Sequence, residues 1–157
     1  MLHGELVELR SRIESDVAVL HAELYDDVET RMRGDTRPWV PLAADSPHSP
    51  FRIADARDDV AFFSVVERVS NELAGETLAL LCRYGFEVRG LNRLQLETLS
   101  DDEPMIRTAL SAGFTEEGRL RSSRSLGGSF ADEVVFGLLA SDRSPALVCS
   151  RGEGKDK

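Results

Sequence analysis

The stretch at residues 73–86, LAGETLALLCRYGF, constrains the fold more than any other part of the sequence. Its first half has the composition of a strand end, and its second half has the apolar spacing of an amphipathic helix. No turn or loop residues separate the two halves. A protein that binds a phosphorylated cofactor usually keeps its binding loop at such a strand-to-helix junction. The sequence therefore predicts a direct strand-to-helix connection, with no room for a phosphate-binding loop.

The composition is that of one globular domain. The chain has 157 residues, of which 41% are hydrophobic and 30% are charged. This length is enough for one core and too short for two ordinary domains. No apolar run approaches the roughly 20 residues of a membrane-spanning helix. The charged N-terminus also differs from a signal peptide, so we expect no membrane partner.

The net charge of −9 bears on the kind of partner. Nucleic-acid phosphates require clustered Lys and Arg, so nucleic acid is not expected as a partner. The charge could steer a basic or amine-bearing substrate, although solubility alone is the simpler explanation. Cysteine occurs only at Cys82 and Cys149. This sparse use predicts a reducing, cytoplasmic location, with Cys82 as a small buried hydrophobe.

The N-terminal part predicts a strand, a helix and a long loop. Alternating residues indicate the strand at 2–10. Ser15 or Asp16 is expected to cap the helix that follows, in which apolar residues recur at helical spacing. The proline-rich segment at 34–59 is predicted to be a loop. Within it, Trp39 is either a lid packed on the domain or part of a ligand wall.

The C-terminal part predicts further strands and one helix. Residues 59–70 are rich in β-branched and aromatic side chains, and a break at 70–72 indicates a hairpin that leads into residues 72–76. The remaining elements are a strand at 91–99, a helix at 103–113 and two strands joined at Gly127-Gly128. Phe136 lies in the last strand, which is apolar on both faces and is therefore expected in the core. Together these elements predict an α+β fold, with a mixed, mostly antiparallel sheet flanked by helices.

Three stretches carry a more specific signal. They are LHGELVELR at the N-terminus, LNRLQLETLSDDEPMIRTALSAGFTEEGRLR in the middle and GGSFADEVVFGLL near the end. Together they resemble the GNAT acyl-CoA N-acyltransferases, most closely the ribosomal-protein N-terminal acetyltransferase branch. The resemblance covers residues 2–140. It implies one GNAT-like domain at 1–140, followed by a polar tail at 141–157 that we expect to be disordered.

The resemblance implies a reaction. It predicts transfer of an acetyl group from the co-substrate acetyl-CoA to a primary amine, on a peptide N-terminus or a small molecule, without a metal. In this family the pantetheine arm lies between two splayed strands, and backbone N–H groups polarise the thioester carbonyl. N–H groups at a helix start hold the pyrophosphate. A carboxylate or an ordered water takes the proton from the attacking amine.

Site residues follow by the same resemblance. The cofactor contacts fall around the start of the helix at 103–113, at Thr98, Leu99, Asp102 and Met105. Trp39 is the candidate for the wall of the substrate site. Glu67 is the candidate general base, although a salt bridge with a neighbour would also account for it.

The sequence departs from the family pattern at three places. The fourth strand, the phosphate loop and the first helical turn are missing at the junction in residues 73–86. Asp102 stands where the family usually has Asn, and with its acidic neighbours it would repel a phosphate while capping the helix well. Ala109 stands where many members have a Tyr that protonates the leaving thiolate.

Two functional readings follow from these departures. The chain is either an N-acetyltransferase, or a catalytically impaired remnant of the fold that acts as a homodimeric or partner-binding module. A third possibility is that an encoded segment is absent from this sequence. Because loss of a middle strand leaves unpaired edges, we expect the chain to form a homodimer.

Overall fold

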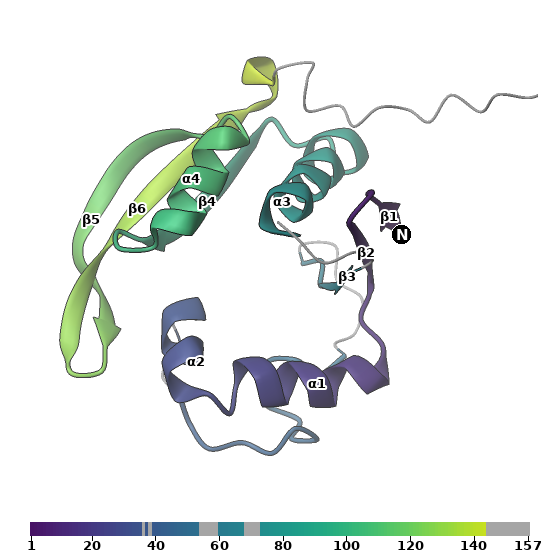
Figure 1. Cartoon of the computed structure of the whole chain (residues 1–157), viewed down its shortest axis with the longest axis vertical. Helices are drawn as coiled ribbons and strands as arrows, with labels where there is room; N and C mark the ends of the chain where they lie inside the picture. Colours follow the sequence, from purple (N-terminus) through teal and green to yellow (C-terminus); the bar gives the residue numbers. More distant parts are fainter. Residues whose placement is uncertain (36, 38, 54–59, 68–72, 144–157) are drawn as a thin grey trace, which may run out of the picture.

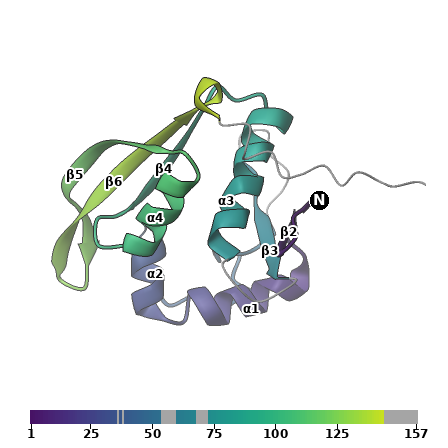
Figure 2. The same cartoon turned by 45° about the horizontal axis from the view of Figure 1, so that its top comes forward.

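The computed structural model describes residues 1–35, 37, 39–53, 60–67 and 73–143. Within them, two three-stranded sheets lie on either side of a helix, α3 (Figures 1 and 2). Every strand pair is antiparallel, and helices flank the strands, so the predicted α+β class is confirmed. In the part of the chain that is described, no helix is both long and apolar enough to cross a membrane.

The N-terminal sheet has the order β1-β2-β3. Its strands are β1 (Leu2–His3), β2 (Val7–Ser11) and β3 (Phe63–Glu67). The strand predicted at 2–10 is therefore two strands, because the Gly4 N–H donates to the Val7 carbonyl at 2.9 Å and closes a turn. Val7 and Leu9 are fully buried on one face of β2, as alternation along a strand requires.

Two helices, α1 (Glu14–Leu24) and α2 (Val28–Gly34), follow β2 and lie together at one end of the molecule (Figure 1). Asp27 caps α2, because its side chain accepts hydrogen bonds from the backbone N–H groups of Glu29 and Thr30. The chain then enters the segment at 39–53, which contains no helix or strand, as its prolines predict.

Asp16 does not cap α1, nor does Ser15, so that prediction is wrong. The helix starts earlier, with Ile13 at its N-cap. The Asp16 carboxylate accepts hydrogen bonds from Arg10 Nη1 at 2.7 Å, the Ile13 N–H at 3.0 Å and the Ser64 hydroxyl at 2.7 Å. These bonds hold the pKa of Asp16 well below its usual range, and the bond from Arg10 has the largest effect. Asp16 thus joins α1 to β2 and β3.

The C-terminal sheet has the order β4-β6-β5. Its strands are β4 (Arg93–Leu99), β5 (Thr115–Leu126) and β6 (Ser129–Leu139), and a 3-10 turn at Ala140–Asp142 follows β6. The turn between β5 and β6 is formed by Gly127 and Gly128, whose φ angles of 52° and 89° favour glycine. The predicted hairpin is confirmed. The predicted tail at 141–157 lies outside the described residues from residue 144 onward.

Helix α3 (Leu73–Arg83) packs against both sheets. Leu78 and Cys82, one turn apart, belong to the apolar cluster around Phe136 in the C-terminal sheet. Leu80 belongs to the cluster of β2, and Leu73, two turns before it, packs on the same cluster. Burial raises the pKa of the Cys82 thiol to about 11, which fits the predicted buried hydrophobe. A π-helical turn, η1 (Tyr84–Val88), continues the helix.

The prediction that residues 72–76 form the end of a strand is therefore wrong for residues 73–76, which are helical. The physical reason is that residues 73–76 contain only two apolar residues, Leu73 and Ala74, which are too few to show the helical period that the later residues of α3 carry. The hairpin predicted at 70–72 lies outside the described residues.

Helix α4 (Glu103–Ser111) covers one face of the C-terminal sheet (Figure 1). Ala109 is fully buried there, while Met105 and Ile106 pack against the cluster around Phe136. The four-residue run from Asp102 to Met105 starts the helix, with Pro104 in its first turn as predicted. The α4 backbone is therefore anchored both by its apolar face and by its cap.

We predict that Phe136→Ala lowers the free energy of unfolding by about 3–5 kcal/mol, because it removes a fully buried ring. Phe130→Ala is the matched control, since Phe130 lies on the same strand but is 70% exposed. Urea unfolding followed by circular dichroism measures both variants. Equal effects of the two substitutions would contradict the placement of Phe136 in the core.

Candidate cofactor site

A pocket of about 570 Å³ lies between the start of α3 and the outer side of α4. Its described lining residues come from these two helices and the C-cap of α4, and they are Ala74, Gly75, Pro104, Arg107, Thr108, Ser111 and Ala112. At Gly75 a side chain would meet no other atom within 4 Å, so the backbone of the first turn of α3 faces open space. The first N–H groups of a helix have no partner within the helix and favour anions.

The α4 side of the pocket supplies a cation and hydroxyl groups. Arg107 is 67% exposed and pairs with Glu103 at 3.3 Å, so its guanidinium retains donors for a ligand. The Thr108 hydroxyl donates to the Pro104 carbonyl at 2.9 Å, and Ser111 lies one turn further along. A guanidinium, hydroxyls and a helix start are the groups that bind phosphate oxygens.

Glu76 fixes the position of α3 relative to the N-terminal hairpin. Its carboxylate accepts hydrogen bonds from three consecutive backbone N–H groups, those of Glu5 at 2.6 Å, Leu6 at 2.7 Å and Val7 at 2.7 Å. Gly4 makes this possible, because a Cβ at residue 4 would lie 2.5 Å from the Glu76 carboxyl carbon. The first turn of α3, which forms one wall of the pocket, is thereby tied to β2.

The three acidic residues around the start of α4 each have a hydrogen-bond or ion-pair partner. Asp102 caps the helix, because its carboxylate accepts from the Met105 N–H at 3.2 Å and from the Thr98 hydroxyl at 2.9 Å. Asp101 pairs with Arg33 of α2 at 2.9 Å, and Glu103 pairs with Arg107. The capping role expected for Asp102 is confirmed. Its neighbours are less repulsive toward an anion than the sequence suggests.

The four residues predicted to contact the cofactor lie together at the β4–α4 junction. Thr98 and Leu99 are buried at the end of β4, and Asp102 and Met105 are linked by the cap. They adjoin α4 but are not among the described lining residues of the pocket. Their contact with a cofactor stays a prediction.

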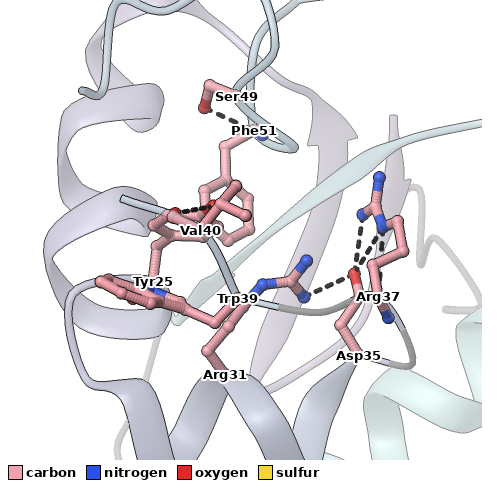
Figure 3. A network of polar contacts seen from close by, with 8 residues as sticks. All are labelled: Tyr25, Arg31, Asp35, Arg37, Trp39, Val40, Ser49 and Phe51. Atoms are coloured by element: carbon pink, nitrogen blue, oxygen red, sulfur yellow. Dashed lines mark hydrogen bonds and ion pairs between the residues drawn. The ribbon is translucent and has the colours of Figure 1, made fainter. Parts of the chain in front are cut away.

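Glu67 and Trp39 lie in other parts of the fold. Glu67 is exposed at the end of β3, opposite Val7 in the ladder. Trp39 is half-buried against the end of α1, where its indole N–H donates to the Tyr25 carbonyl at 3.0 Å (Figure 3). The structure therefore shows Trp39 packed on the domain, and its role in a substrate wall stays a prediction, as does the role of Glu67 as a base.

Sequence reasoning missed the residues that line the pocket. On α4, Arg107, Thr108 and Ser111 form a polar stripe at helical spacing beside the buried Ala109, a pattern that the sequence contains. The α3 side could not be found in this way, because residues 74 and 75 were predicted to be in a strand. In the described ranges, no three His, Cys, Asp or Glu side chains are grouped so that they could hold a metal ion.

The chain between β3 and α3 is short. Residues 68–72 are all that separate Glu67 from Leu73. A strand of ordinary length has about five or six residues, so this segment cannot supply a further strand and a phosphate-binding loop as well. Among the described strands, β3 pairs only with β2 and β4 only with β6.

Comparison with known proteins identifies the fold. No protein-family model and no curated protein matches the chain. One similar solved structure is that of spermidine N-acetyltransferase from Vibrio cholerae in complex with CoA and spermine. The alignment covers 88% of this chain and 98% of that enzyme, with 16% identity and a TM-score of 0.66. A GCN5-related N-acetyltransferase from Brucella melitensis covers 93% and 80%, with 22% identity and a TM-score of 0.62.

Other matches are partial. Mutant forms of the Vibrio cholerae enzyme SpeG align with 50% of this chain and 49% of their own, at a TM-score of 0.45, and a further acetyltransferase aligns over 40% of its length. The two extensive matches show that the chain has the fold of the GNAT acetyltransferases. The resemblance seen in the sequence is thus confirmed for the GNAT fold, while the ribosomal-protein branch stays a prediction.

We predict that Glu76→Ala lowers the free energy of unfolding by about 1.5–3 kcal/mol, because three backbone N–H groups lose a charged acceptor. Glu5→Ala is the matched control, since its exposed side chain lies in the same turn. Urea titrations of both variants give the comparison. If Glu5→Ala costs as much as Glu76→Ala, the Glu76 carboxylate does not hold the turn.

Proposed function

We propose that the chain transfers an acetyl group from acetyl-CoA to a primary amine, on a peptide N-terminus or a small molecule. The observation that carries this proposal is the pocket between α3 and α4, which places a helix start, a guanidinium and hydroxyls together in a chain with the GNAT fold. The Vibrio cholerae structure with the same fold is a complex with CoA and spermine, a cofactor and an amine of the proposed classes.

In this proposal the pocket holds the phosphates of acetyl-CoA. Arg107 pairs with them, and Ser111 and the first turn of α3 donate hydrogen bonds. The residues at the β4–α4 junction, Thr98, Leu99, Asp102 and Met105, contact the remainder of the cofactor. We assign no metal to the reaction.

The acyl transfer itself needs one proton acceptor. The amine nitrogen attacks the thioester carbonyl, a C–N bond forms, the C–S bond breaks, and CoA leaves as a thiolate that takes up a proton. We assign to Glu67, which is exposed on β3, the role of the general base that accepts the proton of the attacking amine. When Glu67 accepts this proton, the lone pair of the amine nitrogen becomes free to attack the carbonyl carbon. We assign to Trp39 a place in the wall of the substrate site.

A second function is favoured by the separation of the two sheets. Because no described strand bridges β3 and β4, the site has fewer backbone groups for the pantetheine arm than the family provides. In this alternative the chain is a catalytically impaired or inactive remnant that acts as a homodimeric or partner-binding module. We infer a cytoplasmic location for either function, from the sparse use of cysteine.

We predict that acetyl-CoA binds with a dissociation constant above the micromolar range, because the phosphate loop is missing. Arg107→Gln should raise this constant about tenfold, since a charge-assisted bond is lost. Arg121→Gln is the control, because it removes the same charge from the exposed face of β5. Calorimetry measures binding, and release of CoA thiol with spermine or a peptide as acceptor measures turnover.

The outcomes separate the two functions. Binding with turnover supports the acetyltransferase, and binding without turnover on any amine supports the impaired remnant. The absence of binding at millimolar acetyl-CoA would contradict the proposed cofactor pocket. Equal loss in Arg107→Gln and Arg121→Gln would show that only net charge matters.

We also predict that the chain is a homodimer, because the outer edge of β3 has no strand partner among the described residues. Val65, which is 49% exposed on β3, adds apolar surface on a face of the sheet beside this edge. Val65→Asp should therefore shift the species in solution toward the 17.3 kDa monomer. Val19→Asp is the control, since Val19 is 61% exposed on α1. Light scattering that finds a monomeric wild type at micromolar concentration rules out this assembly.

A further inference from the structure

A second hollow lies between α1, α2 and the chain around Phe51. It has a volume of about 280 Å³ and adjoins a hollow of about 380 Å³, with which it shares Arg31, Arg37 and Pro50. The described lining of the first hollow is Arg12, Leu24, Thr30, Arg31, Gly34, Asp35, Arg37, Pro50, Phe51 and Phe62. None of these residues lines the pocket between α3 and α4.

The charge of this lining is opposite to that of the chain. Among the described residues, three arginines and one aspartate line the first hollow, and the described lining of the neighbouring hollow adds no acidic residue. The whole chain has a net charge of −9. A local excess of guanidinium groups in an acidic protein focuses a positive potential on the hollow.

Arg31 is buried at this site, with 8% of its surface exposed. Its guanidinium carbon lies 5.3 Å from the centre of the Tyr25 ring, and Nη1 pairs with Asp35 at 2.5 Å. The Nε atom is buried and has no hydrogen-bond acceptor among the described residues. A buried donor without a partner costs free energy. A ligand that offers an acceptor to Nε would therefore be favourable, and so would a small shift of Arg31 that brings Nε to an acceptor.

Arg12 has an incomplete set of partners as well. Its guanidinium carbon lies 5.7 Å from the centre of the Phe51 ring and 5.5 Å from that of Phe62. Nη1 donates to the Phe51 carbonyl at 2.9 Å, and the buried Nε has no acceptor within the described ranges. In the described part of the chain no carboxylate forms an ion pair with Arg12. Burial accordingly lowers its pKa, although the charge of Asp16 opposes the effect.

Asp35 is shared between the other two arginines (Figure 3). It pairs with Arg31 on one side and with Arg37 Nη2, at 2.7 Å, on the other. Burial alone would raise the pKa of Asp35, but the bonds from Arg37 and Arg31 hold it well below its usual range. One carboxylate therefore serves two guanidinium groups, and Arg37, whose side chain is 64% exposed, can turn its remaining donors toward a ligand.

We propose that this hollow is a binding site for a small organic anion, with a carboxylate or phosphate group on Arg12 and Arg37 and a planar or apolar body against Phe51 and Phe62. The two rings give the body an apolar surface, and guanidinium groups bind carboxylate and phosphate oxygens in the same forked geometry. The site does not require acetyl transfer and stands apart from the function proposed above.

The test measures direct binding to the unmodified full chain at low ionic strength. The probes are benzoate, phenyl phosphate, inorganic phosphate and, as the charge-reversed control, benzylamine. Amide chemical shifts of Thr30, Gly34 and Phe51 report binding at the hollow, and calorimetry gives the dissociation constants. We expect benzoate or phenyl phosphate to bind at these residues, and benzylamine not to bind. If only one of the two anions binds, the result identifies the acidic group of the ligand.

Two variants separate a site from general surface charge. Arg37→Gln should raise the dissociation constant of the anion about tenfold, because one charge-assisted contact is lost. Arg52→Gln, at an exposed arginine outside the described lining, should leave binding within about twofold. Both side chains are exposed, so folding is preserved in each variant.

Several results would overturn the proposal. They are equal losses in the two variants, binding of benzylamine as strong as that of benzoate, and an absence of shifts at the hollow with every anion. Inorganic phosphate that binds as tightly as phenyl phosphate would overturn the role of the two rings.

Discussion

One helix must satisfy two apolar cores, and the rest of this structure depends on that constraint. Leu78 and Cys82 of α3 close the core of the C-terminal sheet, and Leu80 closes that of the N-terminal sheet. With no described strand between β3 and β4, this helix provides the apolar contact between the two halves. Burial at roughly 25 cal/mol per Å² on both faces makes the position of α3 costly to change. The candidate cofactor pocket inherits its shape from that position, because its walls are α3 and α4.

Polar contacts also hold separate elements of the fold together. Asp16 joins α1 to the N-terminal sheet, and the pair of Arg33 with Asp101 joins α2 to the start of α4. The ion pair between Arg33 and Asp101 is exposed and contributes little free energy. It therefore holds α2 to the start of α4 less firmly than Asp16 holds α1 to the N-terminal sheet. The acidic composition is thus compatible with anionic ligands, because Glu103 beside the pocket and Asp35 in the second hollow are each paired with an arginine.

The sequence predicted those parts of the fold that follow from local rules. The glycine turn at 127–128, the capping by Asp102 and the burial of Phe136 each depend on few neighbours and were predicted correctly. The start of α3 was not, because it has too few apolar residues to show the helical period by itself. The described residues that line the two candidate sites were not predicted from the sequence. Arg12, Arg37 and Phe62 are distant in sequence and meet through the tertiary fold, which no spacing rule can show.

The contact between Gly4 and Glu76 has a consequence for how this sequence can vary. Any side chain at residue 4 would occupy the space of the Glu76 carboxylate, so the carboxylate would have to leave the three N–H groups that it binds. The two positions are therefore epistatic: a larger residue at 4 displaces the Glu76 carboxylate, and this cost disappears once residue 76 has become small. In an alignment of future relatives, glycine at the first position and glutamate at the second should be inherited as a pair, although 71 other residues lie between them along the chain.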